Sequence, residues 1–179
     1  MKVVLLIISL TVPLFSQAAV VEKPSQAYPE QAVRNYGWMF DIKESLLSIS
    51  MNDTAKKFIT EESLNRYFKL KMRNFAKELK FLDEKEVSGL NYNYSYIKLE
   101  ILKYNDKTKI YYGLISLKMD SSVLWEGKPR VYELTKAIAG SEPQMLNFIK
   151  EDIDLFVEAL AEDYYRIADE KEKHNKQIN

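Results

Sequence analysis

Acidic side chains near the C-terminus are the first candidates for chemistry, because paired carboxylates can act as general acid and general base. Glu151 and Asp152 precede Asp154, Glu158 and Glu162, and the last three share one helix face at a spacing of four residues. A general acid needs a raised pKa, which normally comes from apolar burial. These carboxylates fall largely opposite an apolar stripe, so we expect a solvated helix face and rank a carboxylate-based hydrolase last among the functional hypotheses.

Residue types that build most other catalytic and cofactor sites are scarce in this chain. The 179 residues include no cysteine and one histidine, His174, in a charged tail. This composition excludes thiol catalysis, iron–sulfur clusters, cysteine-based zinc sites and histidine-cluster metal sites. Glycine-rich phosphate loops, dinucleotide-binding fingerprints and zinc-protease motifs are also absent from the sequence. We therefore predict no cofactor and no metal, and we favour a protein that is not an enzyme.

Tyrosine is the residue type that best indicates a binding surface. The chain has 12 tyrosines, and three of them alternate along one predicted strand. Exposed tyrosines offer a large apolar area with a polar tip, which suits contact with a protein partner. Aromatic residues also favour strands in general and can simply cover the second face of a sheet, so that alternative stays open. The candidate partner surface comprises Tyr92, Tyr94, Tyr96, Lys98, Tyr104 and Tyr112.

Charge is unevenly distributed although the formal net charge is zero, a balance that argues against a nucleic-acid partner. Residues 61–80 are predominantly basic, whereas residues 142–173 are predominantly acidic. Two helices with these charges attract each other if they lie side by side, which is the interpretation we favour. Alternatively, the basic helix faces an anionic surface such as lipid headgroups. The candidate basic face comprises Arg66, Lys69, Arg73 and Lys77.

The first 18 residues have the pattern of a Sec-type signal peptide. Lys2 forms a minimal positive region, Val3–Val12 is apolar, and small side chains at Ser16 and Ala18 predict cleavage after Ala18. The apolar run is too short to span a bilayer, and no later run is long enough. We therefore predict export to the periplasm, with secretion as the alternative and no transmembrane segment after cleavage.

The remaining chain is predicted to form one domain with an extended N-terminal arm and a polar C-terminal tail. Residues 19–39 contain Pro24 and Pro29 without a sustained periodicity, which indicates an extended N-terminal arm. Residues 40–173 form the domain, because no internal linker is long enough to divide it. Residues 174–179 are a polar tail.

The first half of this domain shows a strand and then a helix. Residues 40–51 place Leu47 and Ile49 on alternating positions, which predicts a strand. Apolar residues then recur every three or four positions after Thr60, a residue type that caps helices. This spacing predicts an amphipathic helix over about 61–79.

In the second half of the domain, the apolar residues first alternate as in a strand and then return to the spacing of a helix. Residues 92–119 predict a β-hairpin, with Ile97, Leu99 and Ile101 on the buried face and a turn at 105–108. Residues 120–125 either extend this hairpin or start another strand, and Arg130–Ala139 fits a strand and a helical turn equally. The apolar stripe Met145, Ile149, Ile153, Phe156, Leu160, Tyr164 and Ile167 then predicts a long helix.

The predicted order β–α–β–β–(β)–α gives an α+β domain, in which an antiparallel sheet of three to five strands carries two helices on one face. The layout over residues about 44–167 resembles that of small exported bacterial proteins of unknown function, which implies fold and location alone. The resemblance is carried by Thr60-Glu61-Glu62, the hairpin, Leu124-Trp125-Glu126, and Phe156 with Asp163-Tyr164-Tyr165.

Three functional hypotheses follow from these patterns. The leading one is an exported accessory module that binds a protein partner in the cell envelope through the tyrosine-bearing hairpin or the arm. The second is a carrier for a small apolar ligand or lipid held between sheet and helices. The third is the carboxylate-based hydrolase, for which Glu158 and Glu162 are the candidate residues.

Overall fold

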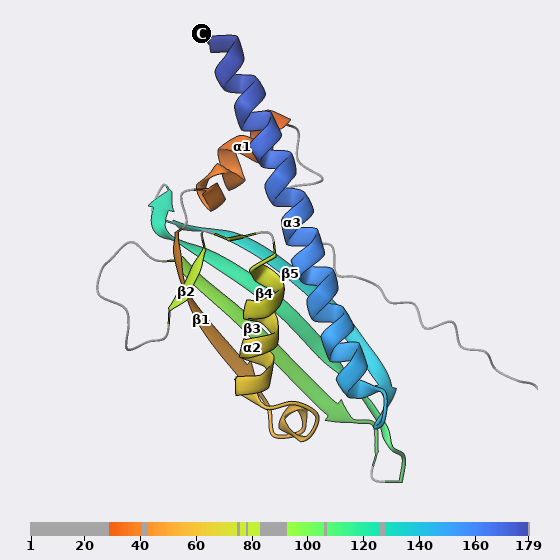
Figure 1. The fold of residues 1–179 in the computed structure, drawn as a ribbon. Coiled ribbons are helices and arrows are strands. Elements are labelled where there is room, and N and C mark those ends of the chain that lie inside the picture. Colours follow the sequence, from red (N-terminus) through yellow and green to blue (C-terminus); the bar gives the residue numbers. More distant parts are fainter. Residues whose placement is uncertain are drawn as a thin grey trace, which may run out of the picture.

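The computed structural model describes residues 29–40, 43–74, 76–77, 79–82, 93–105, 107–125 and 128–178. These residues form a five-stranded sheet and three α-helices (Figure 1). In chain order the elements are α1 (Pro29–Tyr36), the 3-10 turn η2 (Gly37–Phe40), β1 (Glu44–Met51), the 3-10 turn η3 (Ala55–Lys57), α2 (Glu61–Met72), β2 (Lys80–Leu82), β3 (Asn93–Lys103), β4 (Ile110–Trp125), β5 (Lys128–Ser141) and α3 (Met145–Ile178).

The sheet is mixed, with the strand order β2-β1-β3-β4-β5. β1 runs parallel to both β2 and β3, whereas β3, β4 and β5 pair antiparallel. An α+β domain is therefore confirmed, but the expectation of a wholly antiparallel sheet is wrong at β1. The reason is that α2 follows β1 and returns the chain across the sheet, and such a crossover makes the flanking strands parallel.

The predicted hairpin over 92–119 is present and is longer than expected. β3 and β4 pair from Tyr94 opposite Asp120 to Lys103 opposite Tyr111. Asn105 closes the turn, because its side-chain oxygen accepts hydrogen bonds from the backbone N–H groups of Lys107 and Thr108. Residues 120–125 extend β4, and Arg130–Ala139 is a strand within β5.

α2 and α3 cover one face of the sheet, as Figure 1 shows. Thr60 caps α2 by accepting a hydrogen bond from the backbone N–H of Ser63, as its residue type predicts. Apolar side chains of both helices meet the inward side chains of β3 and β4 in one core. Its fully buried members include Leu64, Phe68, Ile97, Leu99, Ile101, Ile115, Leu117, Met145, Ile149 and Ile153.

The N-terminal arm predicted for 19–39 is wrong over its second part. Residues 29–36 form α1, which packs against α3, and Ala32, Tyr36 and Trp38 are buried. Pro29 stands at the first position of this helix, where a missing N–H costs nothing, so the proline starts the helix instead of preventing it. The fold thus has a third helix and begins before residue 40.

Two further boundaries differ from the expectations. α2 ends at Met72, well before Leu79, and residues 80–82 form the short strand β2. α3 continues to Ile178, so most of the predicted polar tail is helical. The predicted signal peptide, residues 1–18, and residues 19–28 of the arm lie outside the described residues.

Tyr132 joins α1, β5 and α3 in the core. It is 2% exposed, its ring packs edge-on against Tyr36, and its hydroxyl donates a hydrogen bond to Asp163 at 3.0 Å. Asp163 is itself buried. Burial, together with the charge of Asp163, raises the pKa of Tyr132 above the ordinary 10.0. This side chain therefore stays protonated in the folded protein well into the alkaline range.

We expect Tyr132→Phe to lower the free energy of unfolding by about 1–3 kcal/mol near neutral pH, because buried Asp163 loses a donor. Since the folded pKa is raised, the stabilisation from this proton is complete below the unfolded pKa of 10.0 and is lost as the pH rises above it. Urea denaturation measures the free energy of unfolding at about pH 8 and about pH 10.5. Between these pH values it should fall more for wild type than for Tyr132→Phe, by at most about 1.4 kcal/mol per pH unit. Equal losses in the two proteins contradict this assignment.

Candidate functional site

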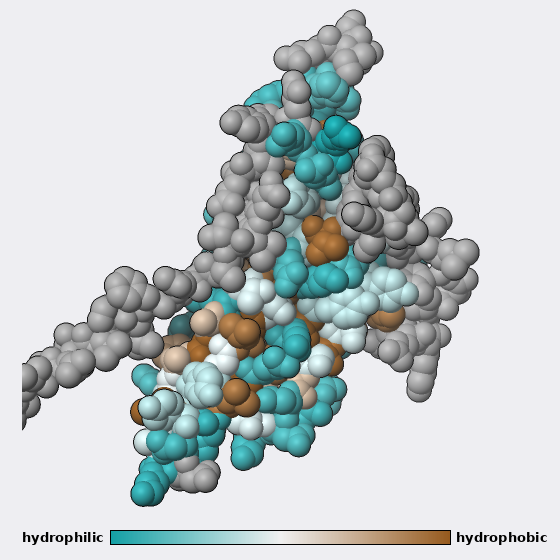
Figure 2. All heavy atoms as spheres, turned by 180° about the vertical axis from the view of Figure 1, so that it is seen from behind, coloured by the Kyte–Doolittle hydropathy of each residue, from teal (hydrophilic) through white to brown (hydrophobic). Residues whose placement is uncertain are grey.

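The side of the sheet that faces away from α2 and α3 is here called the outer face. Along β3, Ser95, Ile97 and Leu99 are buried beneath the helices, whereas Tyr96 and Lys98 between them are exposed. This alternation follows from the two-residue period of a strand. Figure 2 shows the molecule from behind, with brown apolar residues gathered among pale and teal ones over its lower part. The candidate partner surface of β3 thus lies on the outer face, as the alternation predicts.

Aromatic and charged groups are interleaved in the middle of the outer face. Tyr94 and Tyr96 stack with their ring centroids 5.9 Å apart, and Lys118 from β4 lies 5.9 Å from the centre of the Tyr96 ring. Burial, with a smaller contribution from Asp120, raises the pKa of Tyr96 above its ordinary value. Lys98 pairs with Glu100 at 2.9 Å and Lys118 pairs with Asp120 at 2.8 Å. Tyr92 lies outside the described residues.

The turn end of the same face carries a set of large apolar side chains, here called the hairpin patch. Leu102 lies opposite Tyr112, and the backbone N–H of Tyr104 bonds to the carbonyl of Ile110. At roughly 200 Å² for a fully exposed large side chain, the exposed parts total about 500 Å², near the upper end for a monomer. The hairpin patch and its exposed fractions are Leu102 50%, Tyr104 68%, Ile110 48%, Tyr112 44% and Leu114 50%.

Tyr104 and Tyr112 were found from the sequence, but the leucines and the isoleucine of the hairpin patch were not. The signal was present, because Leu102 and Leu114 occupy the strand positions that alternate with the buried residues. Residue type alone identifies the tyrosines of this surface and not its aliphatic residues. The alternation of the strands places the aliphatic residues on the same outer face.

The predicted basic face is shorter than expected. Arg66 and Lys69 lie on α2, but Arg73 is the residue that ends the helix, and Lys77 lies in a turn beyond it. Arg66 pairs with Glu62 at 3.0 Å on an exposed surface. These four residues therefore do not form one continuous helical stripe, since the helix ends at Met72.

The oppositely charged helices α2 and α3 do lie side by side. Tyr67 donates a hydrogen bond to the carboxylate of Asp154 at 2.9 Å, and Lys71 pairs with the same carboxylate at 2.8 Å. Burial raises the pKa of Tyr67, followed by its hydrogen bond to Asp154. The bond to Asp154 likewise raises the pKa of Lys71. Asp154 of α3 thus bonds to two side chains of α2 and stabilises the contact between the two helices.

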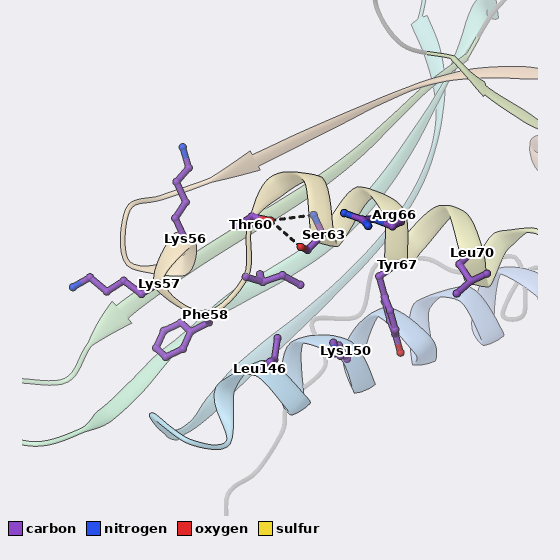
Figure 3. Close-up of a pocket in the computed structure, with 11 residues that line it drawn as sticks. Lys56, Lys57, Phe58, Thr60, Ser63, Arg66, Tyr67, Leu70, Leu146 and Lys150 are labelled. Atoms are coloured by element: carbon purple, nitrogen blue, oxygen red, sulfur yellow. Dashed lines mark hydrogen bonds between the residues drawn. The ribbon is translucent and has the colours of Figure 1, made fainter.

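A hollow of about 520 Å³ opens beside this contact, between η3, α2 and α3 (Figure 3). We call it the helix groove. Its position differs from the cavity between sheet and helices that an apolar carrier was expected to have, and sequence reasoning did not identify it. It is lined by Lys56, Lys57, Phe58, Ile59, Thr60, Ser63, Arg66, Tyr67, Leu70, Leu146 and Lys150.

The acidic residues of α3 divide into two groups. Glu158 and Glu162, the hydrolase candidates, are exposed, and neither lines the helix groove. Asp152, expected on the solvated face, is instead buried at 4% exposure and bonded to Lys136 of β5. Burial raises the pKa of Asp152 despite the opposing effect of Lys136. Among the described residues, no group of His, Cys, Asp or Glu side chains forms a metal site.

Comparisons with known proteins give a distant structural likeness and no relative by sequence. No family model and no curated protein matches the sequence. A solved structure described as that of an uncharacterized protein aligns with 68% of this chain and 92% of its own, at 5% identity and a TM-score of 0.41. In the described part of the chain, no helix is long and apolar enough to cross a membrane.

The Lys136–Asp152 pair gives a test of whether Asp152 is structural. We expect Lys136→Met to lower the free energy of unfolding by about 2–4 kcal/mol, because it leaves a buried carboxylate unpaired, with some relief from the partial exposure of the lysine. The double variant Lys136→Met/Asp152→Leu should recover most of this loss, since an apolar pair of similar volume replaces the ions. Urea denaturation measures both values. If the double variant is less stable than Lys136→Met, the ion pair does not explain the loss of stability.

Proposed function

We propose that this chain is an exported accessory module that binds a protein partner through the outer face of the β3–β4 hairpin. The observation that carries the proposal is the hairpin patch, in which five large apolar side chains are about half exposed at one end of one sheet face. The largest exposed apolar patch of a monomer is often a functional surface. Tyr96 lies on the same face beyond Glu100 and Lys98, towards the middle of the sheet.

The chemistry of the outer face favours a protein over a lipid surface. Its apolar end continues into a zone where lysines and carboxylates alternate, including the Lys98–Glu100 and Lys118–Asp120 pairs. An apolar, aromatic centre beside a polar border of both charges is the common anatomy of protein interfaces. An anionic bilayer would be repelled by the carboxylates as much as it is attracted by the lysines.

Export is the second part of the proposal and is supported by the N-terminal sequence. A basic residue, a short apolar run and small residues before position 19 match what signal peptidase requires. The domain also suits an oxidising compartment, because a chain without cysteine cannot form incorrect disulfides.

The export prediction is tested by expressing the full chain in a Gram-negative host and fractionating the cells. We expect a periplasmic protein whose N-terminal residue, read by mass spectrometry, is Ala19. The variant Ala18→Tyr should accumulate uncleaved at the membrane, because a bulky residue blocks the −1 site. A full-length protein that stays in the cytoplasm would contradict export.

The partner surface is tested by cross-linking in extracts of the source cell, with variants matched in type. We expect Tyr104→Ala/Tyr112→Ala to lose a specific cross-linked partner, because tyrosines at the centre of an interface commonly contribute 2 kcal/mol or more, about thirtyfold in affinity. Tyr94→Ala/Tyr96→Ala tests the middle of the face in the same way.

The matched control is Tyr165→Ala, which removes from α3 a tyrosine whose exposure lies between those of Tyr104 and Tyr112. It should retain the partner, and circular dichroism should show all three variants folded. If the outer-face variants and the control capture the same proteins in the same amounts, the proposed surface is wrong.

A further inference from the structure

The outer face holds most of the large apolar side chains that the described part of the chain exposes. Eleven such side chains are more than a third exposed, and seven of them lie on this face. Five form the hairpin patch, and Tyr96 and Val131, each 37% exposed, lie further along the same face. The other four belong to α2 and α3. The exposed apolar surface is thus concentrated on the side of the sheet that Figure 2 presents.

Charged side chains in the middle of the outer face are of both signs and largely neutralise each other. Lys98 pairs with Glu100, and Lys118 pairs with Asp120. Glu133 of β5 lies beside Lys118 in the sheet. A surface of this kind has no strong net charge to attract a markedly acidic or basic partner. A balanced mixture of charges can instead complement a copy of itself, because each sign finds the other across the contact.

The position of the hairpin patch at one end of the outer face limits how two copies can meet. Sheets that pack face to face keep their strand directions within about 30° of each other. A two-fold axis parallel to the strands, between β3 and β4, places apolar end against apolar end and charged middle against charged middle. An axis across the strands sets the hairpin patch of one copy against the charged middle of the other when the two faces overlap. The first axis therefore gives the matched contact, in which both copies use the same surface.

The register of the hairpin then determines which side chains are opposed. Each outer residue of β3 faces the residue of β4 in the second copy that is its own ladder neighbour. Leu102 faces Tyr112 of the second copy, which joins the two hairpin patches. Tyr96 faces Lys118 of the second copy, so the cation–π contact within each chain is repeated between the chains. The other opposed pairs, none of which joins like charges, are Glu100 with Leu114, Lys98 with Ser116, and Tyr94 with Asp120.

The outer face is large enough for such a contact. At roughly 200 Å² for a fully exposed large side chain, its seven exposed apolar side chains, with Lys98, Glu100 and Lys118, expose about 900 Å². A standard stable protein–protein contact buries about 800 Å² on each partner. Two copies that meet through this face can therefore cover the area that a stable dimer needs.

We infer that the chain forms a symmetric dimer through its outer face, with the hairpin patches of the two copies in contact. This inference rests on the proposed function, which places a protein partner on the same face, and it names that partner as a second copy of this chain. The two sheets lie at the centre of the dimer. The helices α2 and α3 of both copies lie on its outside, because they cover the opposite face of each sheet.

The mass of the purified chain in solution tests the dimer, measured by sedimentation equilibrium over a range of concentrations. We expect twice the monomer mass, with dissociation on dilution. Leu114→Glu should raise the dissociation constant about tenfold or more, because the new carboxylate lies opposite Glu100 of the second copy. The matched control is Leu155→Glu on α3, since the two leucines are 50% and 47% exposed. It should dimerise like wild type, and circular dichroism should show both variants folded.

Single-cysteine variants locate the contact, because the chain has no cysteine of its own. Ser116 lies on β4 next to the proposed axis, and face-to-face sheets are about 10 Å apart. A short bis-maleimide should therefore link two copies of Ser116→Cys. It should not link copies of Glu158→Cys, whose cysteine lies on α3 at the outside of the dimer.

The result also separates this inference from the proposed function. If the chain is a monomer at every concentration while Tyr104→Ala/Tyr112→Ala still loses a different cross-linked protein, the second copy is the wrong partner and the proposed surface stands. A monomer with no such protein overturns both. A dimer that is unchanged by Leu114→Glu, or that links equally through both cysteines, forms through another surface and overturns the inference.

Discussion

The antiparallel pairing of β3 with β4 determines where every other feature of this protein lies. Its register, from Tyr94 opposite Asp120 to Lys103 opposite Tyr111, sends alternate side chains to opposite faces. One set forms the core beneath α2 and α3, and the other forms the outer face. A shift of one residue in this register would exchange the two sets, so the large buried area under the helices fixes the outer face as firmly as it fixes the core. Tyr112 lies on the outer face because its neighbour Tyr111 is buried, and Leu102 lies there because Ile101 is buried.

Local periodicity predicted the parts of this fold that depend on local contacts. The hairpin, the first strand and the helix that begins after Thr60 follow from alternation, three-to-four spacing and capping. The parallel pairing of β1 with β3 could not be predicted in this way, because it joins Ser45 to Asn93 across a whole helix and a connection. α1 could not be predicted for another reason: prolines usually mark a break in a helix, but Pro29 stands in the first turn, where a proline is compatible with helix formation.

The candidate sites show the same division between local and distant information. Alternation along one strand placed Tyr94, Tyr96 and Lys98 on the outer face, whereas the helix groove combines segments that are far apart in sequence and has no local pattern. Asp152 was misplaced because it stands at the border of the apolar stripe of α3. A border position becomes buried only when a partner such as Lys136 faces it from another element, and helical periodicity alone contains no such information.

The helix groove and the hairpin patch lie back to back at one end of the sheet. Phe58 lines the groove and packs edge-on against Tyr111 with ring centroids 4.9 Å apart. Tyr111 is buried in β4, and the next residue, Tyr112, belongs to the hairpin patch. Close-packed interiors respond to a displaced ring by moving its neighbours, since few voids are available to absorb the change. Phe58 therefore connects the lining of the helix groove to the buried side of β4, whose opposite side carries the hairpin patch.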